Sequence, residues 1–468
     1  MSKNGKGIFQ MERDHSSNCE HEYEVQEQLE LPIYKTPLHV IDAFLSERLG
    51  TFQDNLHAPI HSWFKYPAGF SYKLVEALIE DHNLNADSWV LDPFVGCGTT
   101  SVVAKQRSIN SVGIEAHLFV YWVAKVKCFW EYDMEKLYQS IQKLFTYLYR
   151  IPSFPGAESL SDFPELVRKC YSDSNLWVLK FIRDHLDDCS YGDEEADFFR
   201  LALTNTLREA SKAGTGWPYI APSKYHEKSE QPALEVFHKT VKGMYRDLLD
   251  ILTNHSRAFI ETRLLLMDAR ARYPMEGETI DLAVTSPPYL NNYDYADRTR
   301  LEMYFFGWAK SWREITNKVR DKLITAATTQ VVRNRFLPNP LCPDIHDLDP
   351  KLYKELSNKI HQIEEIRPQK GGKKSYDLMV AGYFNDMLTV IKQVYRVLKP
   401  SAHFVLVLGD SAPYGIHIPT EEYLGRLSVA VGFRNYSIHN LRERGRKWKH
   451  NPQRHKVMLK EGILILEK

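Results

Sequence analysis

The sequence has no C-x-x-C pair, no net charge and no long apolar run. Its six cysteines are scattered, so their spacing predicts neither a zinc ribbon nor a disulfide framework, and we expect the protein to require no metal. No stretch reaches the roughly eighteen apolar residues of a membrane span, and the first residues lack the apolar core of a secretory signal. We therefore expect a cytoplasmic protein that makes no membrane contact.

Charge is balanced over the whole chain, with 60 basic and 60 acidic residues among 468. This balance excludes a uniformly basic, histone-like binder but leaves local basic patches open. With 43% hydrophobic and 12% aromatic residues, the chain can fill a substantial core. The polar, acidic start predicts a partly disordered N-terminal arm over residues 1–50.

Residues 88–115 have the pattern of a βαβ unit. The run SWVLDPF predicts a short buried strand that enters a glycine turn, TTSVVAKQRS continues as a helix, and SVGIEA predicts a second strand ending at Glu115. Such units build doubly wound, mostly parallel sheets. Further strands are predicted in TRLLLMDA, TIDLAVTSPPY and AHFVLVLGD, and FRNYSIHN with EGILILEK predict a closing β-hairpin.

The predicted sheet is assembled from three separated pieces of chain, residues 51–130, 257–311 and 376–468. Residues 131–256 show helical periodicity without strand signals, so we interpret them as a helical insertion. Residues 312–375 interrupt the pattern again, and we interpret them as a second, irregular insertion.

The turn after the first predicted strand has two glycines. It reads Asp92, Pro93, Phe94, Val95, Gly96, Cys97, Gly98 and Thr99. Its glycines let the backbone approach a small polar ligand closely. Ser101 stands where a dinucleotide fingerprint needs a third glycine, and no Gly-Lys-Ser/Thr follows, so neither a dinucleotide loop nor a Walker loop is predicted. Glu115 is placed to accept hydrogen bonds from a ribose diol, and a plain tight turn is the alternative.

A second turn, Ser286-Pro287-Pro288-Tyr289, stops another predicted strand. The prolines fix their φ angles and lack backbone donors, so carbonyl oxygens face outward beside the Ser286 hydroxyl and the Tyr289 ring. An exocyclic amino group on a flat ring fits such a turn, because its two N–H donors can bond two oxygens while the ring stacks on the tyrosine. A strand stop with a packed tyrosine is the alternative.

Together the two turns resemble those of the S-adenosylmethionine-dependent amino methyltransferases that act on DNA. Further landmarks of that family occur in order over roughly half of the chain, namely Lys65-Tyr66-Pro67-Ala68-Gly69-Phe70, Glu115, Asp268-Ala269-Arg270, Leu398-Lys399-Pro400 and Gly409-Asp410-Ser411. The resemblance implies an α/β fold with a Rossmann-like doubly wound methyltransferase sheet, a terminal β-hairpin and a helical insertion. It makes the three sheet pieces one catalytic domain, with the cofactor loop in the first and the catalytic turn in the second.

The resemblance also assigns roles within the site. It implies S-adenosylmethionine as cofactor, with its methionine end held by Lys65, Tyr66, Pro67, Asp92, Pro93, Phe94, Gly96, Gly98 and Thr99. Glu115 would hold the ribose and Asp268 the adenine. The catalytic turn would be Ser286, Pro287, Pro288 and Tyr289. A serine in the first position is typical of the cytosine-N4 subgroup, whereas aspartate or asparagine is commoner in adenine-N6 enzymes.

The chemistry expected from this resemblance is methyl transfer to the N4 amine of a cytosine that has been flipped out of double-stranded DNA. Hydrogen bonds from N4–H to the Ser286 Oγ and the Pro287 carbonyl would localise the nitrogen lone pair, and alignment with the methyl group would supply proximity. No covalent intermediate is needed. C5-cytosine enzymes use a cysteine that follows a proline, whereas here Cys342 precedes Pro343, which disfavours C5 chemistry.

A basic turn lies between the strands of the predicted hairpin. Residues 442–456 hold seven lysines and arginines against the single acid Glu443. We expect this turn to contact phosphates through Arg442, Arg444, Arg446, Lys447, Trp448, Lys449 and Arg454. A solvated basic turn is the alternative. The 131–256 insertion is a candidate for target recognition and the 312–375 insertion a candidate for DNA contact.

Other functions stay open at this stage. They are transfer to adenine N6, transfer to an exocyclic amine of RNA, and a catalytically silent nucleic-acid-binding module. A cognate restriction endonuclease, as a separate chain, is a candidate partner. We interpret His117 as a satisfied surface group and Asp294 as the ion-pair partner of Arg298.

Overall fold

The computed structural model describes residues 48–66, 69–188, 191–215, 220–221, 229–254, 260–336, 338–444 and 457–468. All of these residues belong to one compact unit, Tyr34–Lys468. In this described part, no helix is long and apolar enough to cross a membrane.

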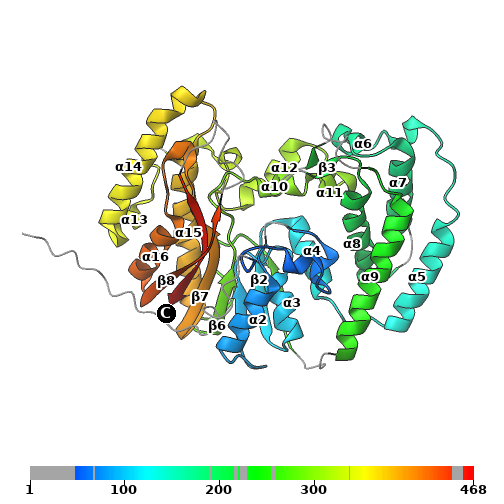
Figure 1. Ribbon diagram of the computed structural model, residues 1–468, viewed down its shortest axis with the longest axis horizontal. Helices are drawn as coiled ribbons and strands as arrows, with labels where there is room; N and C mark the ends of the chain where they lie inside the picture. Colours follow the sequence, from blue (N-terminus) through cyan, green and yellow to red (C-terminus); the bar gives the residue numbers. More distant parts are fainter. Residues whose placement is uncertain are drawn as a thin grey trace, which may run out of the picture. The chain divides into compact units, whose positions relative to one another are not determined.

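A seven-stranded sheet in the order β5-β2-β1-β6-β7-β9-β8 organises this unit (Figure 1). The first five strands in that order are parallel, and β9 pairs antiparallel with both β7 and β8. The strands are β1 Trp89–Asp92, β2 Asn110–Glu115, β5 Thr262–Leu266, β6 Ile280–Thr285, β7 Leu398–Gly409, β8 Asn435–Arg444 and β9 Leu459–Glu467. The predicted α/β fold class, with its doubly wound sheet and terminal hairpin, is confirmed.

The strand order reverses between β1 and β6. From β1 the chain runs outward to β2 and β5, then returns across the sheet to β6 and β7. Because Leu91 of β1 lies beside Ala283 of β6, the two strands end at the same edge. Ligands of open α/β sheets bind in the crevice that such a reversal opens at the carboxyl ends of the strands. The glycine turn and the Ser286 turn both start there.

Helices cover both faces of the sheet because strand residues alternate between the faces. On one face, Val90 and Leu282 pack against α2 and α3, and on the other, Leu91 and Ala283 pack with α15 and α16. These helices are α2 Tyr72–Asp81, α3 Thr99–Gln106, α15 Tyr376–Val397 and α16 Thr420–Val431. The sheet is therefore buried between two helical layers.

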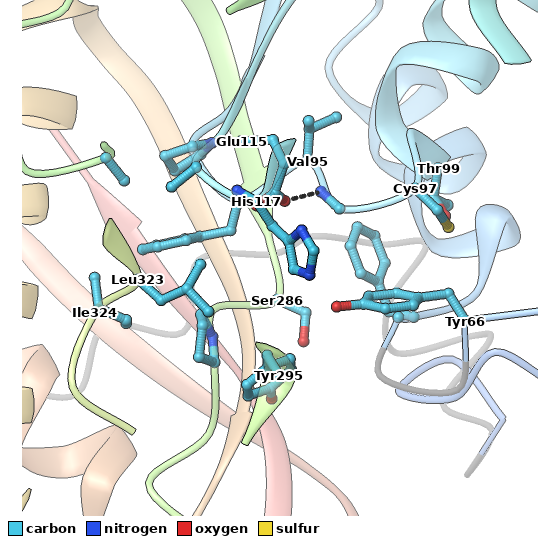
Figure 2. A pocket seen from close by; sticks show the side chains of 18 of the residues that line it. Tyr66, Val95, Cys97, Thr99, Glu115, His117, Ser286, Tyr295, Leu323 and Ile324 are labelled. Atoms are coloured by element: carbon cyan, nitrogen blue, oxygen red, sulfur yellow. Dashed lines mark hydrogen bonds between the residues drawn. The ribbon is translucent and has the colours of Figure 1, made fainter. Parts of the chain in front are cut away.

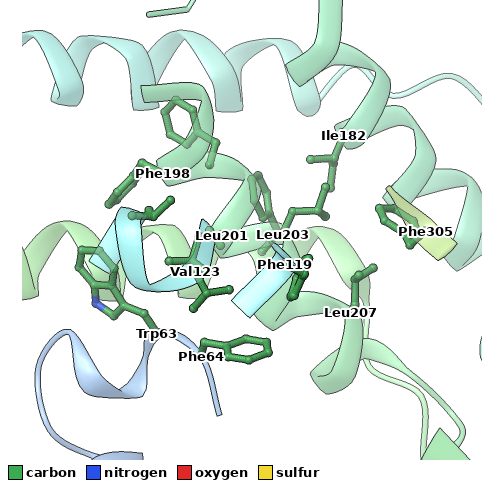
Figure 3. Packing of buried hydrophobic residues seen from close by; sticks show 14 of the residues in the cluster. Trp63, Phe64, Phe119, Val123, Ile182, Phe198, Leu201, Leu203, Leu207 and Phe305 are labelled. Carbon is green, nitrogen blue, oxygen red and sulfur yellow. The ribbon is translucent and has the colours of Figure 1, made fainter. Parts of the chain in front are cut away.

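The first insertion is helical, as its periodicity predicts. It contains α5 Met134–Leu148, α6 Glu165–Lys169, α7 Asp173–Asp188, α8 Asp193–Ala210 and α9 Ala233–Asn254. Figure 3 shows that Phe119 and Val123 of α4 (Leu118–Cys128) pack against Phe198 and Leu201 of α8 in one apolar core. The insertion thus shares its core with the sheet domain. One expectation was wrong, because β3 Gly214–Thr215 and β4 Ile220–Ala221 form a small two-stranded sheet.

The second insertion is largely helical, so the expectation of an irregular segment was wrong. It holds α12 Trp312–Lys318, α13 Pro343–Leu348 and α14 Pro350–Ile366, preceded by α10 Tyr295–Arg298 and α11 Arg300–Phe305. Pro343 and Pro350 start α13 and α14, where a missing N–H costs nothing. Asp349 caps α14 by accepting from the Leu352 N–H at 2.8 Å. Two prolines of this segment are therefore helix starts.

Candidate active site

A cavity of about 740 Å³, open to solvent, lies at the carboxyl edge of the sheet beside β1 and β6 (Figure 2). Both turns contribute to its wall. The lining residues are Tyr66, Gly69, Phe70, Pro93, Phe94, Val95, Gly96, Cys97, Thr99, Glu115, Ala116, His117, Ala269, Ser286, Pro288, Tyr295, Lys322, Leu323 and Ile324.

The glycine turn is shaped by backbone that only glycine adopts easily. Gly96 and Gly98 have φ angles of 54° and 89°. A Cβ on Gly98 would also lie 3.3 Å from the Cα of Ala124 in α4, closer than nearly all real contacts. Gly98 therefore lets α4 pack against the turn, while Gly96 exposes its backbone to the cavity.

Asp92 joins the glycine turn to the Ser286 turn from behind the cavity. Its buried carboxylate accepts hydrogen bonds from the Thr100 hydroxyl at 2.5 Å and from the Thr285 hydroxyl at 2.6 Å. Thr285 directly precedes Ser286. Burial raises the pKa of Asp92 to about 6, although these hydrogen bonds and one from the Phe94 N–H oppose the rise. A buried carboxylate thus fixes the two strand ends relative to each other.

Glu115 faces the cavity at the end of β2. Its carboxylate accepts from the Gly96 N–H at 3.0 Å and from the His117 N–H at 2.8 Å. Burial raises the pKa of Glu115 to about 7, with backbone hydrogen bonds lowering it in part. Because Glu115 also lines the cavity, its carboxylate can accept further hydrogen bonds from a ligand that carries hydroxyl donors.

We expect Glu115→Gln to change how stability depends on pH. Because the folded-state pKa of Glu115 lies above its ordinary value of 4.5, its contribution to stability is complete below about pH 4.5 and is lost as pH rises through about 7. The unfolding midpoint of the ligand-free wild type should therefore fall relative to that of Glu115→Gln between pH 5 and 8. Thermal melts of both proteins, with the exposed Glu158→Gln as control, test this. A constant difference between the two melts would contradict it.

The Ser286 turn borders the same cavity through Ser286 and Pro288. The Tyr289 N–H donates to the Tyr295 hydroxyl at 3.1 Å, and Tyr295 also lines the cavity. Tyr289 itself is half-buried, and the guanidinium of Arg444 lies 5.3 Å from the centre of its ring. Burial and the nearby Glu461 raise the pKa of Tyr289 well above its ordinary range, so its hydroxyl stays protonated.

Two interpretations from the sequence were wrong. His117 is not a surface group, because it is buried in the cavity wall, where its Nε2 lies 2.7 Å from the Thr299 hydroxyl. Burial lowers its pKa to about 3, so the ring is neutral. Asp294 does not pair with Arg298. It caps α10 and pairs with the buried Arg320 at 2.9 Å.

Several predicted site residues lie away from the cavity. Lys65 pairs with Glu209 of the first insertion, and Asp268 makes a bidentate pair with Arg270, whose Nη2 is 2.6 Å from it. Ala269, the next residue, does line the cavity. Pro67 lies outside the described residues.

Five of the seven predicted phosphate contacts follow the last described residue of β8. Arg446, Lys447, Trp448, Lys449 and Arg454 also lie outside the described residues. The two that are described are already paired, since Arg442 and Arg444 both face the buried Glu461 at 3.0 and 3.5 Å.

No sequence pattern predicts one wall of the cavity. Lys322, Leu323 and Ile324 come from the second insertion and line the cavity opposite the glycine turn (Figure 2). The Gln330 side chain holds this segment, because it accepts from the Ala326 and Ala327 N–H groups and donates to the Ile324 carbonyl at 2.6 Å. The insertion therefore builds part of the site.

The sequence is similar to those of known proteins. Residues 13–125 match the DNA methylase family of N6 and N4 methyltransferases. The Type II methyltransferase M.BsoBI of Geobacillus stearothermophilus is 26% identical over 97% of this chain and 95% of its own length. The Type II methyltransferase M.AvaI of Nostoc sp. is 25% identical over 83% of this chain and 82% of its own length. M.MvaI of Kocuria varians is 23% identical over 85% of this chain and 86% of its own length.

These likenesses support an N4/N6 DNA amino methyltransferase. The methyltransferase thus has DNA as its implied substrate and S-adenosylmethionine as the methyl donor that its family implies. None of these likenesses separates transfer to cytosine N4 from transfer to adenine N6. Among the described residues, no group of His, Cys, Asp or Glu is arranged to hold a metal ion.

The cavity of the methyltransferase fits such a donor. The Glu115 carboxylate, which lines the cavity, supplies acceptors for ribose hydroxyls. Gly96 leaves the turn without a side chain on this wall, and the rings of Tyr66 and Phe94 provide apolar surface. The chemistry of the lining therefore matches the cofactor that the family implies.

Proposed function

We propose that the protein methylates the exocyclic N4 of a cytosine that has been flipped out of double-stranded DNA. The observation that carries the proposal is Ser286, which heads the Pro-Pro-Tyr turn on the same cavity wall as Gly96 and Glu115. A serine at this position is typical of the cytosine-N4 subgroup. A cytosine paired in a duplex cannot reach a recessed cavity, so the base must leave the stack at a cost of a few kcal/mol.

S-adenosylmethionine, when bound, supplies a methyl group on a positively charged sulfur. We assign its methionine end to Tyr66, Pro93, Phe94, Gly96 and Thr99, which line the cavity. Glu115 accepts hydrogen bonds from the ribose. Lys65, Asp92 and Gly98 act indirectly, by holding the cavity wall.

The adenine contact proposed for Asp268 needs a rearrangement. Its carboxylate is one-third exposed but is engaged by the Arg270 guanidinium, which also reaches Asp386 at 3.1 Å. Asp268 can accept a hydrogen bond from the adenine amine only by giving up part of this pair. The apolar side chains of Leu323 and Ile324 offer the flat surface on which an adenine ring would rest.

Ser286 and the Pro287 carbonyl accept hydrogen bonds from the two N4–H donors of the cytosine. Because the N4 lone pair is delocalised into the ring, the amine begins as a poor nucleophile. Two acceptors that hold both N–H bonds localise the lone pair and aim it at the methyl group, which supplies both electrostatic stabilisation and proximity. Tyr289 offers a ring for stacking, a contact worth about 1 to 3 kcal/mol per base in single-strand binding.

DNA would approach across the second insertion as well as the basic turn of residues 442–456. Trp312 of α12 is 42% exposed, and its ring is flanked by the guanidinium groups of Arg300 and Arg320 at 4.9 and 4.4 Å. An exposed aromatic ring held by two arginines suits contact with bases or sugars.

The first insertion is our candidate for target recognition. The Type II names of the relatives support a cognate restriction endonuclease as a separate chain.

The product identifies the acceptor. We expect DNA from a methylation-free host that expresses the protein to release N4-methylcytosine on digestion to nucleosides and mass spectrometry. DNA from cells that express Ser286→Ala is the matched control and should contain far less. Finding only N6-methyladenine would refute the assignment to cytosine. Finding the methyl group only in RNA would refute DNA as the substrate.

A further inference from the structure

Arg444, at the end of β8, lies against the catalytic turn rather than reaching outward. Its guanidinium carbon is 5.3 Å from the centre of the Tyr289 ring, within the range of a cation–π contact. Its Nη1 lies so close to Gly409, at the end of β7, that a Cβ there would be 2.7 Å away. The side chain is 23% exposed. Gly409 thus leaves the space that the guanidinium occupies.

A buried carboxylate orients this guanidinium. Glu461 of β9 is 3% exposed in its side chain and lies 3.5 Å from the Arg444 Nε. A carboxylate this deeply buried needs a cationic partner, and two arginines supply it. The Tyr289 ring is therefore covered by a cation that the hairpin holds in place.

Arg442 provides a comparison within the same strand. It lies two residues before Arg444 on the same face of β8 and pairs with Glu461 through two hydrogen bonds of 3.0 and 3.1 Å. Among the described residues, Arg442 makes no cation–π contact with the Tyr289 ring, whereas Arg444 does. The two arginines share one carboxylate, but only Arg444 lies over the catalytic turn.

We propose that Arg444 is a positioning residue for methyl transfer, whose guanidinium, oriented by Glu461, fixes the Tyr289 ring on which the target base stacks. The proposal rests on the function proposed above. It replaces the phosphate contact that the sequence suggested for this arginine. The Tyr289 backbone N–H is held by the Tyr295 hydroxyl, and the Arg444 guanidinium lies over the face of the Tyr289 ring. Together these two contacts limit how far the ring can tilt. Small misplacements of a base relative to the methyl group slow such a transfer strongly.

A double-mutant cycle tests this role. Arg444→Lys keeps the charge but loses the planar guanidinium, and we expect it to lower the single-turnover rate of methyl transfer about tenfold at saturating DNA and cofactor. S-adenosylmethionine affinity should stay within about twofold. In a Tyr289→Ala background, Arg444→Lys should lower the transfer rate by less than about twofold, because the ring through which Arg444 acts is gone. Arg434→Lys, at an exposed arginine that pairs with Glu467 just before β8, is the matched control and should stay within about twofold in both backgrounds.

Each outcome decides the proposal. If Arg444→Lys lowers the rate of methyl transfer by the same factor with and without the Tyr289 ring, Arg444 does not act through Tyr289. If Arg444→Lys and Arg442→Lys weaken DNA binding alike, with a reduced salt dependence and an unchanged transfer rate, both are phosphate contacts and the proposal is overturned. Should Arg444→Lys fail to fold, Glu461→Gln enters the same cycle. A wild type without methyl transfer would refute the proposed function instead.

Discussion

Replacing Ser286 with alanine should lower the rate of methyl transfer roughly 100-fold, because the variant loses one of the two acceptors that we propose localise the lone pair of the target amine. The Pro287 carbonyl remains, so some transfer should persist. Affinity for S-adenosylmethionine should stay within about twofold, since the residues that would hold the cofactor are unchanged. Single-turnover assays with labelled methyl donor, together with calorimetric titration of the cofactor, measure both quantities.

Ser174→Ala is the control for the serine substitution. Ser174 lies exposed on α7, in the helical insertion, and its removal should change neither quantity. If Ser286→Ala lost cofactor affinity as strongly as it lost transfer, Ser286 would be part of the cofactor site. The assignment of the catalytic turn would then be wrong.

Asp92→Ala should lower both the stability of the protein and its rate of methyl transfer. It leaves the Thr100 and Thr285 hydroxyls and the Phe94 N–H without their acceptor in a buried region. Each unsatisfied buried group costs about 1 to 3 kcal/mol, so we expect a loss of at least about 3 kcal/mol in the free energy of unfolding. Methyl transfer should fall below detection, because the glycine turn and the Ser286 turn lose their common anchor.

The matched variant is Asp92→Asn, which keeps the shape of the side chain and an oxygen acceptor. It should retain most of the stability and a measurable cofactor affinity. Urea unfolding of the wild type and the two variants separates these outcomes. Equal destabilisation by alanine and asparagine would show that the negative charge of Asp92, rather than its hydrogen bonds, joins the strands.

The Asp92 interaction explains how two turns almost two hundred residues apart can serve one reaction. Thr285 ends β6 and donates to a carboxylate at the end of β1, so the residue before Ser286 is fixed to the residue before Pro93. The parallel pairing of β1 with β6 places the strand ends at one edge. The hydrogen bond then fixes how far each strand end extends toward the cavity. In our proposal, this determines the distance between the methyl donor and the amine that receives the methyl group.

Local sequence patterns predict those helices, strands and turns that are determined by residues close together in the chain. Alternating apolar residues, the glycine turn and the Pro-Pro stop predict β1, α3, β2 and β6, and the structure has these elements. Their order predicts a doubly wound sheet, and with it the common edge for Gly96 and Ser286. The second insertion was wrongly expected to be irregular, because Pro343 and Pro350 begin helices there, and a proline breaks a helix interior but is favoured in the first turn.

What the sequence determined by itself was the sheet and the two turns at its edge, because strand periodicity and turn chemistry are written in adjacent residues. Only the tertiary structure decided that Lys322, Leu323 and Ile324 close the cavity, that His117 is buried there, and that Arg444 covers Tyr289 while paired with Glu461. These contacts join segments far apart in the chain. Which cation meets which carboxylate or ring depends on the packing of whole elements, and no local pattern encodes that choice.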